Sequence, residues 1–215
     1  KCGHTGTLDF AAEGLLILTS GKATRFTQYF QHLGKQYIAR GRLGVITDTY
    51  DRNGKVIATS EMIPTNEQIK EAILSFIGKS EQMPPSYSSK WVNGERAYRL
   101  AKKGEIFQLK PKVIEISNIE ILEIKYPYFE IKVDCSSGTY MRSLIKDIGD
   151  KLSSGAFMSY LKRTKIGDFD ISSSYKLDDI LNMSKDQLEK LLISPSDALY
   201  FFETLILEDE NIDKF

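Results

Sequence analysis

The stretch GHTGTLDF, residues 3–10, constrains this chain more than any other, because it joins a loop rich in glycine and threonine to one carboxylate, Asp9. Glycine tolerates positive φ angles and lets the backbone approach a ligand closely. Threonine hydroxyls hydrogen-bond nearby backbone groups and hold a turn without bulk. An apolar run follows at once and predicts a short buried strand over 14–18. Two interpretations of Asp9 are open: a turn-forming or capping residue, or a functional carboxylate that the loop displays.

The apolar pattern beyond this loop predicts a mixture of helices and strands. Helical spacing predicts helices over 22–33 and 66–77, within 136–152, and around 177–181 and 185–192, together with a short basic helix that ends at Gly104. Alternation of apolar and polar residues predicts strands over 35–45, 56–58, 111–125 and 127–135, and one fed by residues 160–164.

Several of these elements carry their own end signals. Glycines at 34 and 78 are expected to end the first two helices. An Asn53-Gly54 pair predicts a hairpin turn, and a second turn is expected at 92–94. Hydroxyl side chains at 136, 137 and 139 are expected to cap the helix that follows them.

Composition limits the class of protein. At 215 residues, 41% hydrophobic and 27% charged, the chain has the balance of a globular protein with one large domain or two small ones. It has no apolar run of about 18 residues and no signal-peptide pattern at its start, so a soluble, cytoplasmic protein without a membrane partner is expected. Two distant cysteines, Cys2 and Cys135, and two histidines predict neither a disulfide framework nor a metal site.

The net charge is zero, but the charges are unevenly distributed. Residues 203–215 sum to −4, so residues 1–202 sum to +4. Residues 90–112 hold seven lysines and arginines against two glutamates, a local charge of +5. This segment is either a surface that faces phosphates or a solvated, lysine-rich helix face.

Four segments resemble the TruB-type tRNA pseudouridine synthases. The first is GHTGTLD, followed by GKATRF. The second, PPSYSSKWVNGERAYRLAKKG, is similar to the pattern PPxYSAxKxxGxRAYxxAR, and the third, SSGTYMRSL, is similar to SxGTYxRSL. The fourth, YLKRT, is similar to a YLRR segment. The resemblance covers residues 1–197 and implies an α+β fold: a mixed, largely antiparallel sheet flanked by helices, the pseudouridine synthase catalytic fold with an active-site cleft.

The resemblance also implies a function. Members of this family isomerise uridine to pseudouridine in tRNA, usually U55 of the T arm, so the T stem-loop of tRNA is the expected partner and a monomer the expected state. The base is flipped out of the RNA, its N1–C1′ bond is broken, and C5 is joined to C1′. This isomerisation needs no redox change or energy input, so no cofactor and no metal is expected.

The family's catalytic residues map onto Asp9, Tyr37 and Arg142. Asp9 would act at the ribose, either as nucleophile on C1′ or as the base that removes the C2′ proton. Arg142 would hold this carboxylate through a bidentate ion pair. Tyr37 would stack on the target base and take part in transfer of the C5 proton. It points to the face of its strand opposite to Arg40.

The resemblance also implies five substrate-binding residues. His4 would stack beside the target nucleotide or fill the gap that it leaves. Asp48 would line the site and share Arg142, or it would cap its loop; both roles are compatible with its position. Lys90, Arg96 and Arg163 would contact the RNA.

The chain departs from the family pattern at several places. Phe10 stands where relatives have proline, and Trp91 where they have lysine, with Lys90 one place earlier. Relatives carry a strand and a KPxGxTS-like segment ahead of the first motif. We therefore expect residues 1–197 to be a catalytic domain that lacks this strand, and residues 198–215 to be an acidic tail or the start of a PUA-like domain.

Two other functions are compatible with parts of this pattern. A non-catalytic tRNA-binding or tRNA-folding chaperone on the same fold would need only the basic surface. A glycosidase-like hydrolase would pair Asp9 with a second acid such as Asp48.

Overall fold

The computed structural model describes residues 1–88, 90–92 and 94–203. The chain forms two compact units, Lys1–Ser174 and a second that begins at Tyr175. The expected turn at 92–94 includes Asn93, and most of the expected acidic tail is residues 204–215. These residues lie outside the described part of the chain. The functional division at residue 197 stays a prediction.

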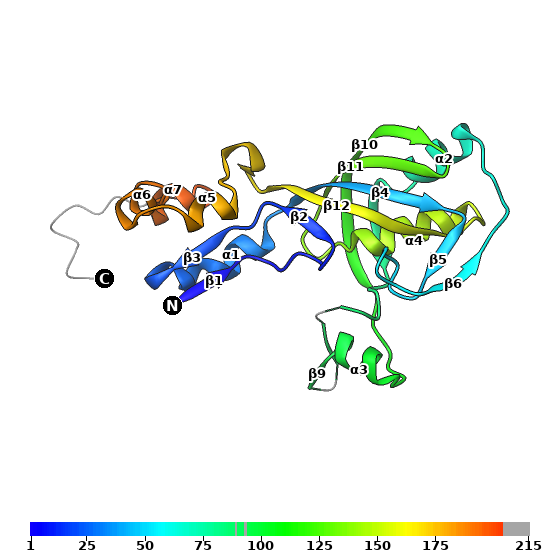
Figure 1. Cartoon of the computed structure of the whole chain (residues 1–215), viewed down its shortest axis with the longest axis horizontal. Coiled ribbons are helices and arrows are strands. Elements are labelled where there is room, and N and C mark those ends of the chain that lie inside the picture. The colour runs from blue at the N-terminus through cyan, green and yellow to red at the C-terminus, as the bar shows by residue number, and fades with distance from the viewer. Residues whose placement is uncertain (89, 93, 204–215) are drawn as a thin grey trace. The chain divides into compact units, whose positions relative to one another are not determined.

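A seven-stranded sheet forms the centre of the first unit (Figure 1). Its path is β13-β12-β4-β11-β10-β7, and β2 pairs with β12 off this path. Every pair is antiparallel except β2 with β12, which is parallel. The α+β fold with a mixed, largely antiparallel sheet is therefore confirmed. The strands are β2 (Ala12–Gly14), β4 (Lys35–Leu43), β7 (Gly78–Gln82), β10 (Lys112–Lys125), β11 (Tyr128–Cys135), β12 (Ala156–Ile166) and β13 (Phe169–Asp170).

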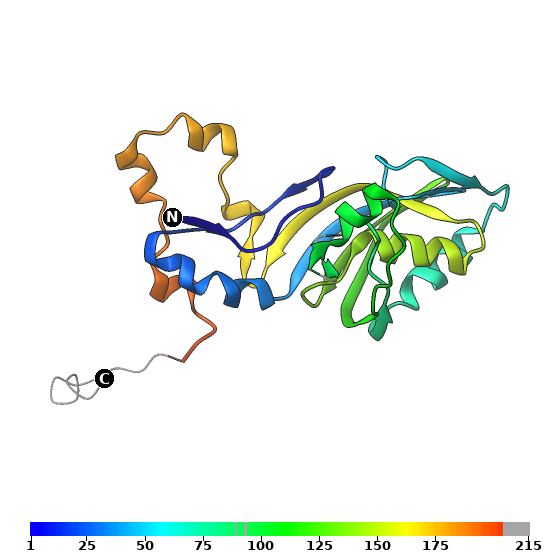
Figure 2. The same cartoon turned by 90° about the horizontal axis from the view of Figure 1, so that it is seen from below.

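Two amphipathic helices, α2 (Asn66–Leu74) and α4 (Met141–Lys151), cover one face of this sheet (Figure 2). Their apolar residues pack in one cluster with the inward-facing residues of β4, β10, β11 and β12. The strand alternation expected from the sequence produces this face, because Phe129, Ile131 and Val133 of β11 are all buried. Gly41 of β4 leaves the space that Phe129 fills, since a Cβ at Gly41 would lie 2.4 Å from its ring.

Smaller elements surround the sheet. A two-stranded ribbon of β1 (Cys2–His4) and β3 (Leu18–Ser20) leads into the 3-10 helix η1 (Gly21–Phe26) and α1 (Thr27–His32). The predicted hairpin is formed by β5 (Val45–Thr47) and β6 (Val56–Thr59). A second hairpin, β8 (Trp91–Val92) with β9 (Glu95–Arg96), leads into α3 (Ala97–Lys103), which ends as predicted at a left-handed Gly104. A 3-10 turn, η2 (Ile171–Ser173), closes the first unit.

The second unit contains three short helices, α5 (Leu177–Leu181), α6 (Lys185–Lys190) and α7 (Pro195–Ala198). The first two confirm the helices expected around 177–181 and 185–192. Helix α6 begins with a capping box, in which Ser184 Oγ accepts from the Gln187 amide while Gln187 Oε1 accepts from the Ser184 amide.

The buried strand expected over 14–18 is wrong. The chain leaves β2 at Gly14 and starts β3 at Leu18, which is 61% exposed. Gly14 has a φ of +113°, and a Cβ there would lie 2.2 Å from the Arg163 carbonyl oxygen. The backbone therefore passes tightly against β12 at this residue and then turns away to pair with β1.

Other element ends also differ from the prediction. The first half of the helix expected over 22–33 is the 3-10 helix η1, and the helix expected to reach Gly78 ends at Leu74. Gly78 instead starts β7, a strand that the sequence analysis missed. Helix α4 has no hydroxyl cap. The side chain of Gln82, from β7, accepts from the Tyr140 amide and donates to the Tyr140 carbonyl instead.

We expect Gly14→Ala to lower the free energy of unfolding by about 3 kcal/mol or more, because it adds both a strained φ and a backbone clash. Gly21→Ala is the matched control: φ is +58°, but no atom lies within 4 Å of the added Cβ. Its cost should be about 1 kcal/mol. Urea unfolding followed by circular dichroism measures both, and equal losses would contradict the tight contact with β12.

Candidate active site

The centre of the site is an ion pair between two residues that are 133 positions apart. Arg142 Nε donates to Asp9 Oδ2 at 2.9 Å, and Arg142 NH2 donates to Asp9 Oδ1 at 2.9 Å. This is the bidentate geometry that fixes a carboxylate in direction as well as position. Asp9 lies in the loop that joins β1 to β2, and Arg142 is the second residue of α4. The ion pair expected from the resemblance is therefore formed.

Arg142 is 5% exposed, and two of its three remaining N–H groups donate to backbone carbonyls. NH1 donates to the Thr49 carbonyl at 3.2 Å and NH2 to the Tyr87 carbonyl at 3.0 Å. A buried guanidinium is tolerated when its charge and its donors are both satisfied. Arg142 thus joins the Asp9 loop to the β5–β6 loop and to the segment that follows β7.

Contacts at the start of α4 fix the position of Arg142. The side chain of Gln82 holds Tyr140 on one side of it. On the other side, Ser143 Oγ donates to the Met83 carbonyl at 2.7 Å. The segment that supplies Tyr87 is therefore tied to the first turn of the helix.

Sequence analysis missed Asp51 as part of this site. Asp51 is 8% exposed, and its Oδ2 lies 3.9 Å from Arg142 Nε. Its Oδ1 accepts from Thr49 Oγ1 at 2.7 Å and from the Asn53 amide at 2.9 Å. The segment TDTYD contains two aspartates, Asp48 and Asp51, and only Asp51 is buried beside Arg142.

Asp48 is placed as a loop-capping residue. Its Oδ1 accepts from the Lys55 amide at 2.8 Å, across the β5–β6 turn. Among the described residues Arg142 pairs with Asp9 and Asp51 and not with Asp48. The suggestion that Asp48 shares Arg142 is therefore wrong.

Tyr37 of β4 lies opposite Arg163 in the ladder with β12. Burial raises the pKa of Tyr37 above its ordinary value, while the nearby Arg163 charge acts in the opposite direction. The phenol is therefore neutral at physiological pH.

Arg163 is 2% exposed, and its donors are directed at backbone. Nε donates to the Leu15 carbonyl at 2.8 Å and NH2 to the Gly6 carbonyl at 3.1 Å. These bonds hold the start of the Asp9 loop, at Gly6, and the residue that follows β2, Leu15, against β12. The contacts of Arg163 thus support a positioning role behind the site, whereas the sequence analysis expected contact with RNA.

Lys35 is a second residue that the sequence analysis missed. It lies two positions before Tyr37, and its Nζ donates to the Gln31 carbonyl at 2.6 Å and to the Leu33 carbonyl at 2.5 Å. Burial, and then the Arg163 charge, lowers the pKa of Lys35 to about 8. At pH 7 it is still mostly protonated and adds a positive charge to the wall of the site.

A cavity of about 950 Å³ brings most of these residues together. Its lining includes all three predicted catalytic residues and three of the five predicted substrate-binding residues, namely Asp9, Tyr37, Arg142, His4, Arg96 and Arg163. Asp48 and Lys90 do not line it. His4 is exposed, and the Arg96 guanidinium carbon lies 4.3 Å from the centre of the Trp91 ring. Burial lowers the pKa of Lys90, whose carbonyl accepts from the Ala97 amide.

Residues 1–88, 90–92 and 94–203 contain no group of three or more His, Cys, Asp or Glu side chains placed to hold a metal ion. None of their helices has the length and apolar character needed to cross a bilayer.

Comparison with known proteins agrees with this geometry. A family model described as "TruB family pseudouridylate synthase (N terminal domain)" matches residues 1–141, and one described as "tRNA pseudouridylate synthase B C-terminal domain" matches residues 142–200. The tRNA pseudouridine synthase B of Clostridium kluyveri is 44% identical over 214 residues, which are 100% of this chain and 73% of that protein. That of Thermosipho melanesiensis is 43% identical over 92% of this chain and 63% of its own length.

Solved structures show the same fold. The crystal structure of a Cbf5-Nop10-Gar1 complex matches with a TM-score of 0.66 and 29% identity, over 89% of this chain and 49% of that one. A structure of an H/ACA RNP bound to a substrate RNA containing 2'-deoxyuridine matches with a TM-score of 0.63 and 27% identity, over 90% and 47%. This chain thus spans about half the length of those two chains.

The fold and the site together define a pseudouridine synthase. More closely, the chain belongs to the TruB family, whose curated members are tRNA pseudouridine synthases.

Proposed function

We propose that this chain isomerises uridine to pseudouridine in tRNA, and that its target is U55 in the T stem-loop. The observation that carries the proposal is the bidentate Asp9–Arg142 ion pair in the wall of the cavity that also contains Tyr37. The cavity volume of about 950 Å³ is large enough for a flipped nucleotide. The family matches support the same reaction.

In this proposal Asp9 supplies the chemistry at the ribose. Arg142 holds both carboxylate oxygens, so Asp9 meets the sugar in one orientation. The carboxylate either attacks C1′ or removes the C2′ proton, and in both cases the N1–C1′ bond breaks. The free uracil turns, and C5 joins C1′ as the Asp9–C1′ ester bond breaks or, on the second route, as Asp9 returns the proton to C2′. The C5 proton then leaves and N1 gains a proton. The overall reaction consumes no other reactant.

Tyr37 supplies the platform for the detached base. An aromatic ring stacks on a base of any sequence. Because burial raises the pKa of Tyr37, its phenol enters the reaction neutral. A neutral phenol can take up the C5 proton only as its own proton is passed on, so we assign Tyr37 to a proton relay between C5 and N1 and not to a resting phenolate base.

Tritium release tests the function directly. Full-length protein is incubated with a T-arm stem-loop whose target uridine carries tritium at C5, and released tritium is counted. Release by the wild type supports the synthase. RNA binding without release would support the non-catalytic tRNA chaperone instead.

We expect Tyr37→Phe to bind the stem-loop with nearly unchanged affinity and to lose about 10²- to 10⁴-fold in turnover, because the ring stays and the proton relay goes. Tyr160→Phe is the matched control, since its hydroxyl donates to Glu13 Oε1 at 2.6 Å, outside the cavity. Filter binding and single-turnover tritium release measure the two effects. Equal losses of binding and turnover in Tyr37→Phe would refute the relay.

We extend the proposal to the RNA-binding residues, the catalytic domain, the oligomeric state and the cellular compartment. His4 and Arg96 contact the RNA at the cavity, and residues 1–197 act as the catalytic domain. The protein works as a monomer in the cytoplasm. Sedimentation of the protein alone and with the stem-loop tests the monomer.

A further inference from the structure

A second hollow, of about 480 Å³, adjoins the cavity at the ion pair. The two hollows share three lining residues, Asp9, Tyr87 and Arg142. The second hollow is therefore within reach of the nucleotide next to a ribose placed at Asp9. The reaction described above gives this hollow no role.

The exposed aromatic side chain of this hollow is Phe10, which directly follows Asp9. Its exposed fraction is 100%. A phenyl ring in water gains nothing for folding, and the family pattern has a proline at this place. A ring that is fully accessible beside the reacting carboxylate can offer its face to a nucleobase.

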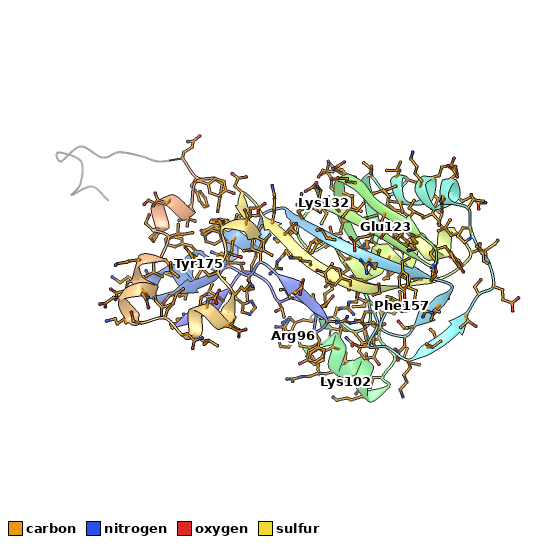
Figure 3. All side chains as sticks on the ribbon, turned by 45° about the horizontal axis from the view of Figure 1, so that its top comes forward. Arg96, Lys102, Glu123, Lys132, Phe157 and Tyr175 are labelled. Carbon is orange, nitrogen blue, oxygen red and sulfur yellow. The ribbon has the colours of Figure 1, made fainter. Side chains whose placement is uncertain are left out.

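Two lysines of the hollow can meet an RNA phosphate. The lining includes two exposed lysines, Lys55 from the β5–β6 hairpin and Lys102 from α3. Figure 3 labels Lys102 and the nearby Arg96. Neither lysine has an ion-pair partner among residues 1–88, 90–92 and 94–203. Their charges are available to a phosphate.

The carboxylates of the hollow are already occupied. Asp48 accepts from the Lys55 amide, and Asp51 accepts from Thr49 Oγ1 and the Asn53 amide. Asp9 is held by Arg142. Asp48 and Asp51 keep their charges, so the lining has three carboxylates against three cations, and Lys55 and Lys102 are the cations without an ion-pair partner among the described residues.

We propose that this hollow is a subsite for the nucleotide directly next to the target uridine in the RNA chain. Its base stacks on Phe10, and its phosphate lies beside Lys55 and Lys102. The inference rests on the proposed function, because it takes the target ribose to be at Asp9.

A mutant cycle between protein and RNA tests the subsite. Three T-arm stem-loops carry C5-tritiated target uridine: one intact, one with an abasic ribose directly 5′ of the target, and one with an abasic ribose directly 3′. The value of kcat/KM is measured for wild type and Phe10→Ala on each. We expect Phe10→Ala to lose about tenfold on intact RNA. For the wild type, kcat/KM on one of the two abasic RNAs should be about tenfold lower than on intact RNA. On that RNA, Phe10→Ala should have the same kcat/KM as wild type.

Val113→Ala is the control. It removes another exposed apolar side chain, 65% exposed on β10 and outside both hollows, and should keep kcat/KM on all three RNAs.

An unchanged kcat/KM in Phe10→Ala on intact RNA would overturn the subsite. The subsite would also be overturned if Phe10→Ala lowered kcat/KM on both abasic RNAs by the same factor as on intact RNA. Failure of the proposed function would look different, because wild type would then release no tritium from intact RNA. That result would remove the subsite together with the function.

Discussion

Asp9→Asn should abolish turnover, with single-turnover tritium release from the T-arm stem-loop falling by about 10³-fold or more. The amide keeps the size of the side chain but can neither attack C1′ nor take up the C2′ proton. RNA binding should persist, because the rest of the cavity is unchanged.

Asp48→Asn is the matched control for this experiment. Asp48 is three positions from Asp51 in the same loop, but its carboxylate is held by the Lys55 amide and makes no pair with Arg142 among the described residues. An asparagine oxygen can accept the same hydrogen bond, so its turnover should stay within about twofold of wild type. A comparable fall in both variants would argue against Asp9 as the reacting group and would reopen the two-carboxylate hydrolase.

Arg142→Lys should lose about 10²-fold or more in turnover and about 3 kcal/mol of unfolding free energy. One ammonium cannot replace the two parallel bonds to Asp9 together with those to the Thr49 and Tyr87 carbonyls. The change therefore disturbs three segments at once and leaves buried acceptors without donors.

Arg40→Lys tests the same substitution on the surface. Arg40 pairs with Glu130 at 2.8 Å, but its side chain is 45% exposed. An exposed pair contributes about 1 kcal/mol or less, so this variant should resemble wild type in stability and turnover. Urea unfolding and tritium release measure both proteins. Near-normal release by Arg142→Lys would show that the bidentate bond is not needed.

Alternation of apolar and polar residues predicted the sheet well where a strand has one buried face. Strands β4, β10 and β11 lie close to the expected ranges for this reason. The apolar run at residues 15–18 led to the wrong prediction of a buried strand. Apolar character alone cannot show that Gly14 passes against the β12 backbone and that the chain then turns away. The cap of α4 was missed for a similar reason, since Gln82 is 58 residues from Tyr140.

Residues of the candidate site were predictable where they belong to a family motif. They were less predictable where burial determines the role of a residue. Asp9, Tyr37 and Arg142 share one cavity as expected. Asp51 and Lys35 went unnoticed, because local sequence does not show which aspartate of a loop is buried or which lysine faces inward. Arg163 looks like an RNA contact by its charge, yet its donors serve the carbonyls of Leu15 and Gly6.

The indole of Trp91, stacked with Arg96, is the only one in the chain. Its intrinsic fluorescence therefore reports on the segment around β8 and β9 and not on the central sheet. With 64% of this residue already in contact with solvent, thermal melting should change the emission little. Binding of RNA at Arg96 should change it strongly, so an unlabelled optical titration can follow ligand binding while the folding transition stays almost silent.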